Sequence, residues 1–83
     1  MPELPELEAR LQKCFSAVFP NLSADEILRA NSASLATWDS LATVTLVSVI
    51  EEEFGISIAP EEYEYMISFD LIRQSLESKA VNA

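Results

Sequence analysis

Apolar and semi-apolar residues recur at helical spacing through the middle of the chain. They stand at i, i+3, i+4, i+7 and i+11, which places them on one face of a helix, and they are Thr43, Leu46, Val47, Ile50 and Phe54. Asp39 precedes them and is a strong N-cap candidate, because its carboxylate can accept hydrogen bonds from the free amides of a first turn. Gly55 is the only glycine of the chain and stands where a helix needs a left-handed residue after its end. The pattern predicts a helix from about Ser40 to Phe54.

A second side of this predicted helix is also partly apolar. Leu41, Val44 and Ser48 fall on a different face from the core positions, and a buried core does not account for them. Glu51 and Glu52 follow farther along the same outward side. We therefore expect the helix to expose a strip on which apolar and acidic side chains lie together.

The segment before the central helix contains a long helix and a long connection. The first helix is predicted from about Pro5 to Phe19, and its apolar face consists of Leu4, Leu7, Leu11, Phe15 and Val18. Pro20 ends that helix, and Ser23-Ala-Asp-Glu26 has the pattern of a capping box that starts a short turn over about residues 24–30. The small and polar residues that follow, from about residue 30 to residue 37, predict a loop.

The segment after Gly55 predicts two further helices. Residues 56–58 alternate like a strand but are too few and have no partner strand, so we interpret them as a packed loop. A short helix opens with a proline and covers about residues 60–66. Ser68 caps a last helix with Phe69, Ile72 and Leu76 pointing inward, and residues 79–83 are expected to fray. Together these elements predict an all-α fold, a small four-helix bundle with a long first loop and a short third helix, in a single domain over residues 1–83.

Charge and composition exclude some classes of function and partner. The chain of 83 residues has fourteen acidic and five basic residues, for a net charge of −9, which argues against nucleic acid as a partner because phosphate contacts need clustered Lys and Arg. An acidic surface instead favours association with basic patches on proteins. No apolar run approaches the roughly 20 residues of a membrane span, and the acidic, proline-broken start is unlike a signal peptide. We expect a cytoplasmic protein without membrane insertion, and a single cysteine fits a reducing compartment.

Side chains for catalysis or metal binding are sparse. Cys14 has no histidine to serve as its base, since the chain contains none, and we interpret it as a small core residue. The acids at 51–53 and 61–62 lack the alternate spacing and the turn glycine of a calcium loop, so we interpret them as a solvated acidic face and predict no metal site. The chain offers no nucleophile–base pair and is predicted not to be an enzyme.

Ser40 has the most specific candidate role. It lies in a first helical turn, where unpaired amides and the positive end of the helix dipole favour an anion, although a serine at a helix start is also ordinary. Asp39-Ser40-Leu41, followed by a helix that ends Glu51-Glu52-Glu53-Phe54-Gly55-Ile56 in a small acidic chain, resembles the acyl carrier protein family. The resemblance covers about residues 4–76, and its specific part is 38–58. It implies a bundle of acyl-carrier type in which 4′-phosphopantetheine is esterified to Ser40, next to Asp39. It also implies that Leu35, from the long loop, packs under the helices.

The resemblance also implies partners and a mechanism. A phosphopantetheinyl transferase would move the arm from coenzyme A to Ser40, a ligase would load an acyl or aminoacyl group as a thioester, and downstream synthases or transferases would use it. Carriers of this family present a docking strip to basic grooves on such enzymes. Here the strip would consist of Trp38, Leu41, Val44, Ser48, Glu51 and Glu52. Contacts of this kind are weak and transient, and we expect a monomer.

The sequence departs from the commonest fatty-acid carriers at several positions. Ala42 and Thr45 stand where such carriers have acids, Ser48 replaces a larger apolar residue, and Thr37-Trp38 replaces a small Gly-containing pair. These changes keep the attachment chemistry and weigh against a role in primary fatty-acid synthesis. The Trp-Asp-Ser-Leu form resembles free-standing carriers of specialised pathways, whose cargo is an amino acid or an unusual acyl group. Trp38 itself has two equal interpretations, as a core residue or as an exposed docking contact.

A rival hypothesis comes from a different class of protein. An unmodified acidic adaptor, or an inhibitor that sequesters a basic protein, would have the same bundle and charge and would not need Ser40. A carrier-like fold that has lost its modification is a third possibility, which the intact Asp-Ser-Leu sequence disfavours.

Overall fold

The computed structural model describes residues 4–82 and consists of helices. In chain order they are α1 (Leu4–Val18), α2 (Ala24–Leu28), α3 (Ser40–Phe54), η1 (Pro60–Tyr65) and α4 (Phe69–Asn82). Over these residues the only β-type pairing is an isolated bridge between Asn31 and Ser68. The predicted all-α class is therefore confirmed. α3 has the predicted bounds, and the bounds of the other helices differ from the predicted ones by a few residues.

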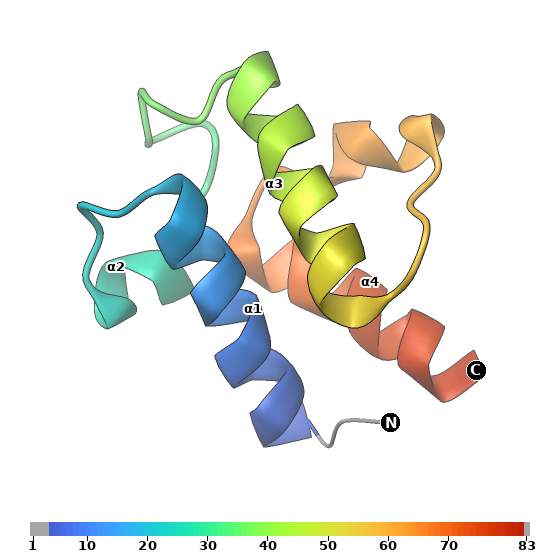
Figure 1. The fold of residues 1–83 in the computed structure, drawn as a ribbon. Helices are drawn as coiled ribbons and strands as arrows, with labels where there is room; N and C mark the ends of the chain where they lie inside the picture. The colour runs from blue at the N-terminus through green and yellow to red at the C-terminus, as the bar shows by residue number, and fades with distance from the viewer. Residues whose placement is uncertain (1–3, 83) are drawn as a thin grey trace.

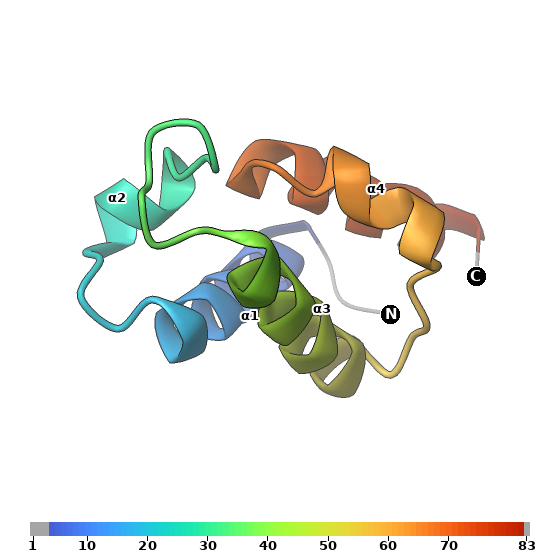
Figure 2. The ribbon, with the colours of Figure 1, turned by 90° about the horizontal axis from the view of Figure 1, so that it is seen from above.

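The helices are arranged around α1 and α3. These two lie side by side and run in opposite directions, while α4 crosses behind them (Figures 1 and 2). α2 contacts α1 and α4 at one end of the molecule, and η1 contacts α3 at the other side. The long loop that follows α2 leads into the start of α3 (Figure 2), where Asp39, Ser40 and Leu41 are exposed.

Phe15 lies at the centre of an aromatic cluster that joins three parts of the chain. Its ring is fully buried and meets the rings of Trp38 and Phe69 edge-on, with centroid distances of 5.4 Å and 5.1 Å. Phe19 completes the cluster at 5.6 Å from Trp38. Edge-to-face contacts of this kind add stability beyond the burial of apolar area. The other buried core residues are Leu7, Leu11, Cys14, Ile27, Ala30, Leu46, Val47, Ile50, Ile58, Met66, Ile72 and Leu76.

The core faces agree with the predicted ones. On α3, Leu46, Val47 and Ile50 are buried, and Thr43 and Phe54 are half-buried. The inward residues predicted for α4 and those predicted for α1 from Leu7 to Phe15 are buried as well, and Val18 is half-buried against the core. The side chain of Leu4 lies outside the part of the chain that the structure describes.

The helix ends follow local capping chemistry. The amide of Ala42 donates to Asp39 Oδ1 (2.8 Å), and Gly55 ends α3 at φ +64°, in the left-handed region that glycine adopts without strain. Ser23 and Glu26 form the predicted capping box, with the amide of each bonded to the side chain of the other.

The segment from Gly55 to α4 differs in detail from the prediction. Residues 56–58 form a packed loop with Ile58 buried, as expected. The short helix η1 is a 3₁₀-helix, the tighter form that short connectors favour. Fraying was wrongly predicted for residues 79–82, because α4 continues to Asn82 and Lys79 Nζ lies 3.0 Å from Glu62 Oε1 on η1. The prediction for Ala83 lies outside the described residues.

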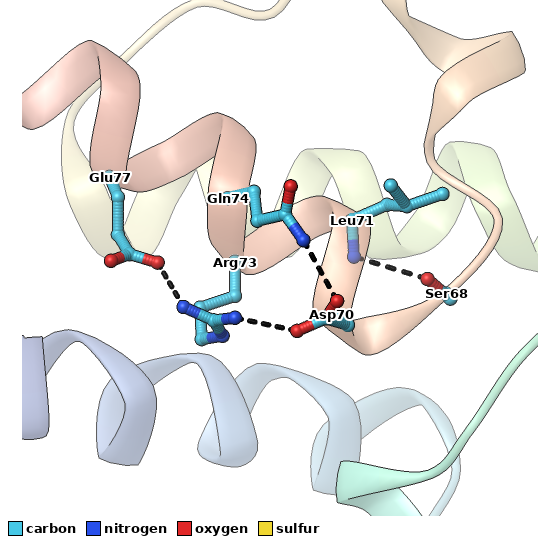
Figure 3. Close-up of polar contacts among 6 residues, drawn as sticks. All are labelled: Ser68, Asp70, Leu71, Arg73, Gln74 and Glu77. Carbon is cyan, nitrogen blue, oxygen red and sulfur yellow. Dashed lines mark hydrogen bonds and ion pairs between the residues drawn. The ribbon is translucent and has the colours of Figure 1, made fainter.

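Polar contacts stabilise the start of α4. Ser68 Oγ accepts the amide of Leu71 (3.1 Å), which confirms Ser68 as the cap (Figure 3). Arg73 is bonded to Asp70 (2.5 Å) and to Glu77 on the same helix (Figure 3). The bond to Asp70 and the neighbouring carboxylates raise the pKa of Arg73 above its usual value.

Arg10 joins α1 to the end of α3. Its Nε donates to Glu53 Oε2 (2.8 Å), Nη2 donates to the Glu53 backbone oxygen (2.5 Å), and the guanidinium lies 4.8 Å from the centre of the Phe54 ring. A cation at a helix C-terminus also interacts favourably with the helix dipole. The hydrogen bond from Arg10 lowers the pKa of Glu53.

Candidate functional site

Ser40 is the first residue of α3, and its side chain is exposed. It directly follows the cap residue Asp39, whose carboxylate is exposed and holds the amide of Ala42. The first turn of α3 contains no acidic side chain. The hydroxyl therefore lies where the helix dipole is positive and where another protein can reach it.

Trp38 fixes the chain just ahead of Ser40. Its indole Nε1–H donates to Thr43 Oγ1 (2.9 Å), and the Thr43 hydroxyl and amide both donate to the Asp39 carbonyl oxygen (3.2 Å and 3.0 Å). The indole also packs on Phe15 and Phe19. These contacts connect the residues on both sides of Ser40 to the aromatic cluster of the core.

Trp38 was wrongly assigned to the docking strip. Only 4% of the residue is exposed, because the rings of Phe15 and Phe19 cover the indole and Thr43 satisfies its N–H. A partner cannot contact a side chain in this position. Of the two interpretations that the sequence left open, the core residue is the correct one.

The other residues of the strip lie at the surface of α3. Leu41 is 74% exposed and Val44 is 49% exposed, an unusual exposure for large apolar side chains. Ser48 and Glu52 are also exposed. Glu51 is half-buried, and its Oε2 accepts the amide of Ile58 (2.8 Å), so this acid also holds the loop after α3.

A groove begins at Ser40 and runs between α3 and η1. Its volume is about 320 Å³, and it is lined by Ser40, Thr43, Val44, Tyr63 and Glu64. Sequence reasoning did not identify Tyr63 and Glu64 as site residues. Their place in the site depends on the packing of η1 against α3, for which the sequence gives no local signal.

The η1 wall of this groove is held in place from two sides. The Glu62 carboxylate pairs with Lys79 of α4 (3.0 Å) and accepts the amide of Ala59 (3.1 Å). The hydrogen bonds from Lys79 and then from Ala59 lower the pKa of Glu62. On the other side, the bond between Ile58 and Glu51 ties the preceding loop to α3.

A second groove lies near the start of α3, against α1 and the long loop. Its volume is about 300 Å³, and it is lined by Val18, Phe19, Pro20, Asn21, Leu22, Leu35, Thr37 and Ala42. Leu35 is half-buried and packs against the core from the loop, as the resemblance led us to expect. No charged side chain lines this groove, which distinguishes it from the groove at Ser40.

The remaining candidates do not add to the site. Cys14 is buried among core residues, and burial raises the pKa of its thiol to about 11, with a smaller contribution from Glu53. Such a thiol is inert as a nucleophile at neutral pH. Among residues 4–82, no group of three or more metal-binding side chains lies close enough to hold an ion. No helix in the same range has both the length and the apolar character needed to cross a membrane.

Comparison of the chain with protein-family models, with curated proteins and with solved structures finds no match. The functional argument therefore depends on the site itself and on the sequence around Ser40.

Proposed function

We propose that this protein is a carrier of the acyl-carrier type, which holds acyl or aminoacyl groups as thioesters on a 4′-phosphopantetheine arm attached to Ser40. The proposal depends on one observation about the position of Ser40. The serine of the Asp-Ser-Leu sequence is exposed at the start of a 15-residue helix, with its neighbours fixed to the core.

The position of Ser40 suits a phosphate ester. The positive end of the α3 dipole favours the negative charge of a phosphodiester. The acid next to Ser40 is the N-cap residue Asp39, whose carboxylate is bonded to the amide of Ala42. Attachment forms a bond between the Ser40 oxygen and the phosphorus of the pantetheine phosphate of coenzyme A, and it breaks the pyrophosphate bond. Adenosine 3′,5′-bisphosphate leaves, and the serine proton passes to a base of the transferase.

The arm supplies the thiol that carries the cargo, and the protein supplies attachment and orientation. Trp38 and Thr43 hold the backbone on either side of Ser40, and Asp39 caps the helix that begins there. The proposed carrier is a cytoplasmic monomer, with no catalytic activity of its own, that serves a specialised biosynthetic pathway.

The exposed side chains of α3 are the proposed docking surface for the transferase, the loading ligase and the enzymes that follow. Leu41 and Val44 offer apolar contacts next to Ser40, and Ser48 and Glu52 continue the surface toward the end of the helix. Acids at the edge of such an interface mainly raise the association rate with basic partners and make it sensitive to salt.

The proposal is tested by incubating the purified protein with coenzyme A and a broad-specificity phosphopantetheinyl transferase, then measuring its intact mass. The expected result is a gain of one phosphopantetheine, which Ser40→Ala abolishes. Ser16→Ala is the matched control, because it removes an exposed serine hydroxyl from α1, outside the proposed docking surface, and leaves the modification intact. A folded wild-type protein that gains no mass would refute the carrier function.

That negative result would favour the second candidate, an unmodified acidic adaptor or inhibitor of a basic protein. Its specific support is the exposure of Leu41, Val44 and Tyr65 on a strongly acidic chain. Such a surface fits a partner that is basic and partly apolar.

A further inference from the structure

The charged residues are unevenly distributed over the fold. From residue 30 to residue 72, which includes α3 and η1, the sequence contains no lysine or arginine. The acids of this span are Asp39, Glu51, Glu52, Glu53, Glu61, Glu62, Glu64 and Asp70. The basic residues Arg10, Lys13, Arg29, Arg73 and Lys79 lie on α1, at the end of α2 and on α4.

Ion pairs neutralise part of this charge, and one of them lies on the η1 wall of the groove at Ser40. Arg10 pairs with Glu53 at the end of α3, and Arg73 pairs with Asp70 on α4. Lys79 pairs with Glu62 between α4 and η1. The groove residue Glu64 is exposed, and the carboxylate of Asp39 beside Ser40 is bonded to a backbone amide.

On the basis of the carrier role proposed above, we infer that the groove between α3 and η1 favours a cargo that bears a positive charge, an aminoacyl group, over a dicarboxylic acyl group. The groove starts at the attachment residue Ser40, and Glu64 lines it. An arm on Ser40 that folds back into the groove places the end of the cargo near the Glu64 carboxylate, and the residues that line the groove include no cationic side chain to receive an anion.

The lining of the groove suits an ammonium group in two ways. The Glu64 carboxylate attracts the charge, and the Tyr63 ring offers an aromatic surface that cations also favour. Val44 can contact the methylene groups that connect the ammonium to the carbonyl. A carboxylate in the same position is repelled, and a contact between unit charges in water corresponds to about a fivefold change in population.

The second groove is the natural alternative for uncharged cargo. It lies on the side of α3 that faces α1, and it is lined mainly by apolar residues such as Leu22 and Leu35. Neither attraction nor repulsion of a charged group is expected there. We therefore expect cationic cargo in the groove between α3 and η1, and uncharged cargo of the same size in the second groove.

The test uses three cargo groups of nearly equal length, each attached to the arm through a stable amide in place of the thioester. These groups are β-alanyl, butyryl and succinyl, which end in an ammonium, a methyl and a carboxylate. The transferase attaches each arm from the corresponding coenzyme A analogue, and intact mass confirms loading. Amide chemical shifts in NMR spectra of the loaded, isotope-labelled protein then report which groove the cargo occupies.

We expect the β-alanyl arm to shift the amides of Tyr63 and Glu64, with groove occupancy about fivefold above that of the uncharged butyryl arm, and the succinyl arm to fall about fivefold below it. The difference should decline from low salt to 1 M salt, where the Debye length is about 3 Å. Glu64→Gln should reduce it, and the control Asp25→Asn, an equal change of charge on α2, should leave it unchanged. A succinyl arm that equals the β-alanyl arm, an unaffected Glu64→Gln variant, or a β-alanyl arm in the second groove would each overturn the inference while leaving the carrier function intact. Absence of loading would overturn both.

Discussion

The hydrogen bond between Trp38 and Thr43 links the core to the attachment residue, and its removal gives a defined loss of stability. Thr43→Val keeps the shape of the side chain but removes the acceptor of the indole N–H. Because Trp38 is only 4% exposed, its N–H is left buried and unpaired, which costs about 1–3 kcal/mol. For a domain of this size, each kcal/mol lowers Tm by about 4–8 °C.

A double-mutant cycle separates this loss from a general effect of the substitution. Trp38→Phe removes the donor, so a second change to Thr43→Val no longer leaves a buried polar group unpaired. We expect the combined variant to be more stable than the sum of the single losses predicts, by about 1 kcal/mol or more. Urea denaturation followed by far-UV circular dichroism measures each free energy of unfolding without relying on the single tryptophan.

Thr45→Val is the matched control for this cycle. Thr45 is exposed on the same helix, and its hydroxyl donates to the Leu41 carbonyl oxygen (3.0 Å). No buried donor depends on it, so the expected change is within about 0.5 kcal/mol. The reasoning would be refuted if Thr43→Val were as mild as this control, or if the cycle were additive to within about 0.5 kcal/mol.

Two further predictions concern the end of α3 and the ion pairs. Gly55→Ala should lower the free energy of unfolding by about 1–2 kcal/mol, because φ at this position is +64°, which an L-residue adopts only with strain. No atom lies within 4 Å of the added Cβ, so no steric clash adds to this cost. An unchanged denaturation midpoint would contradict the prediction. The pKa values of Glu53, Glu62 and Asp70 are lowered by bonds to basic side chains, so the unfolded state binds more protons than the folded state as the pH falls through the usual glutamate pKa of 4.5. The free energy of unfolding should be level above that pH and decrease below it, and the decrease should be smaller in the Lys79→Met variant. Urea titrations over this pH range measure it, and a free energy of unfolding that is independent of pH would refute the prediction.

The helix boundaries that depend on local chemistry were predictable from the sequence. Asp39, Ser23 and Ser68 cap the helices that follow them, and Gly55 ends α3, because each device involves residues only a few positions apart. The end of α4 was not predictable in this way. Its last turn contains Lys79, whose partner Glu62 lies 17 residues earlier in the chain, and no local pattern indicates that contact.

The same distinction between local sequence signals and tertiary contacts applies to the candidate site. The exposure of Ser40 and Leu41 followed from the helix start and from the face opposite the core. The burial of Trp38 did not, since large aromatic residues serve in cores and in interfaces alike, and the rings of α1 decide it. The groove residues Tyr63 and Glu64 enter the site only through tertiary packing of η1.

The distribution of contacts around Ser40 bears on the choice between a carrier and an adaptor. Contacts with the core fix the backbone directly before and after this residue, through Trp38 and Thr43. The side chains that point outward beside it, Leu41 and Val44, are left exposed. An adaptor needs only the exposed side chains, because it has no use for a serine at a fixed position. A carrier needs both features, since different enzymes must dock on the surface and find the same hydroxyl, or the arm on it, in the same place. The hydrogen bonds beneath Ser40 therefore fit the proposed carrier, and the assignment of the attachment to Ser40 rests on the resemblance of the Asp-Ser-Leu sequence.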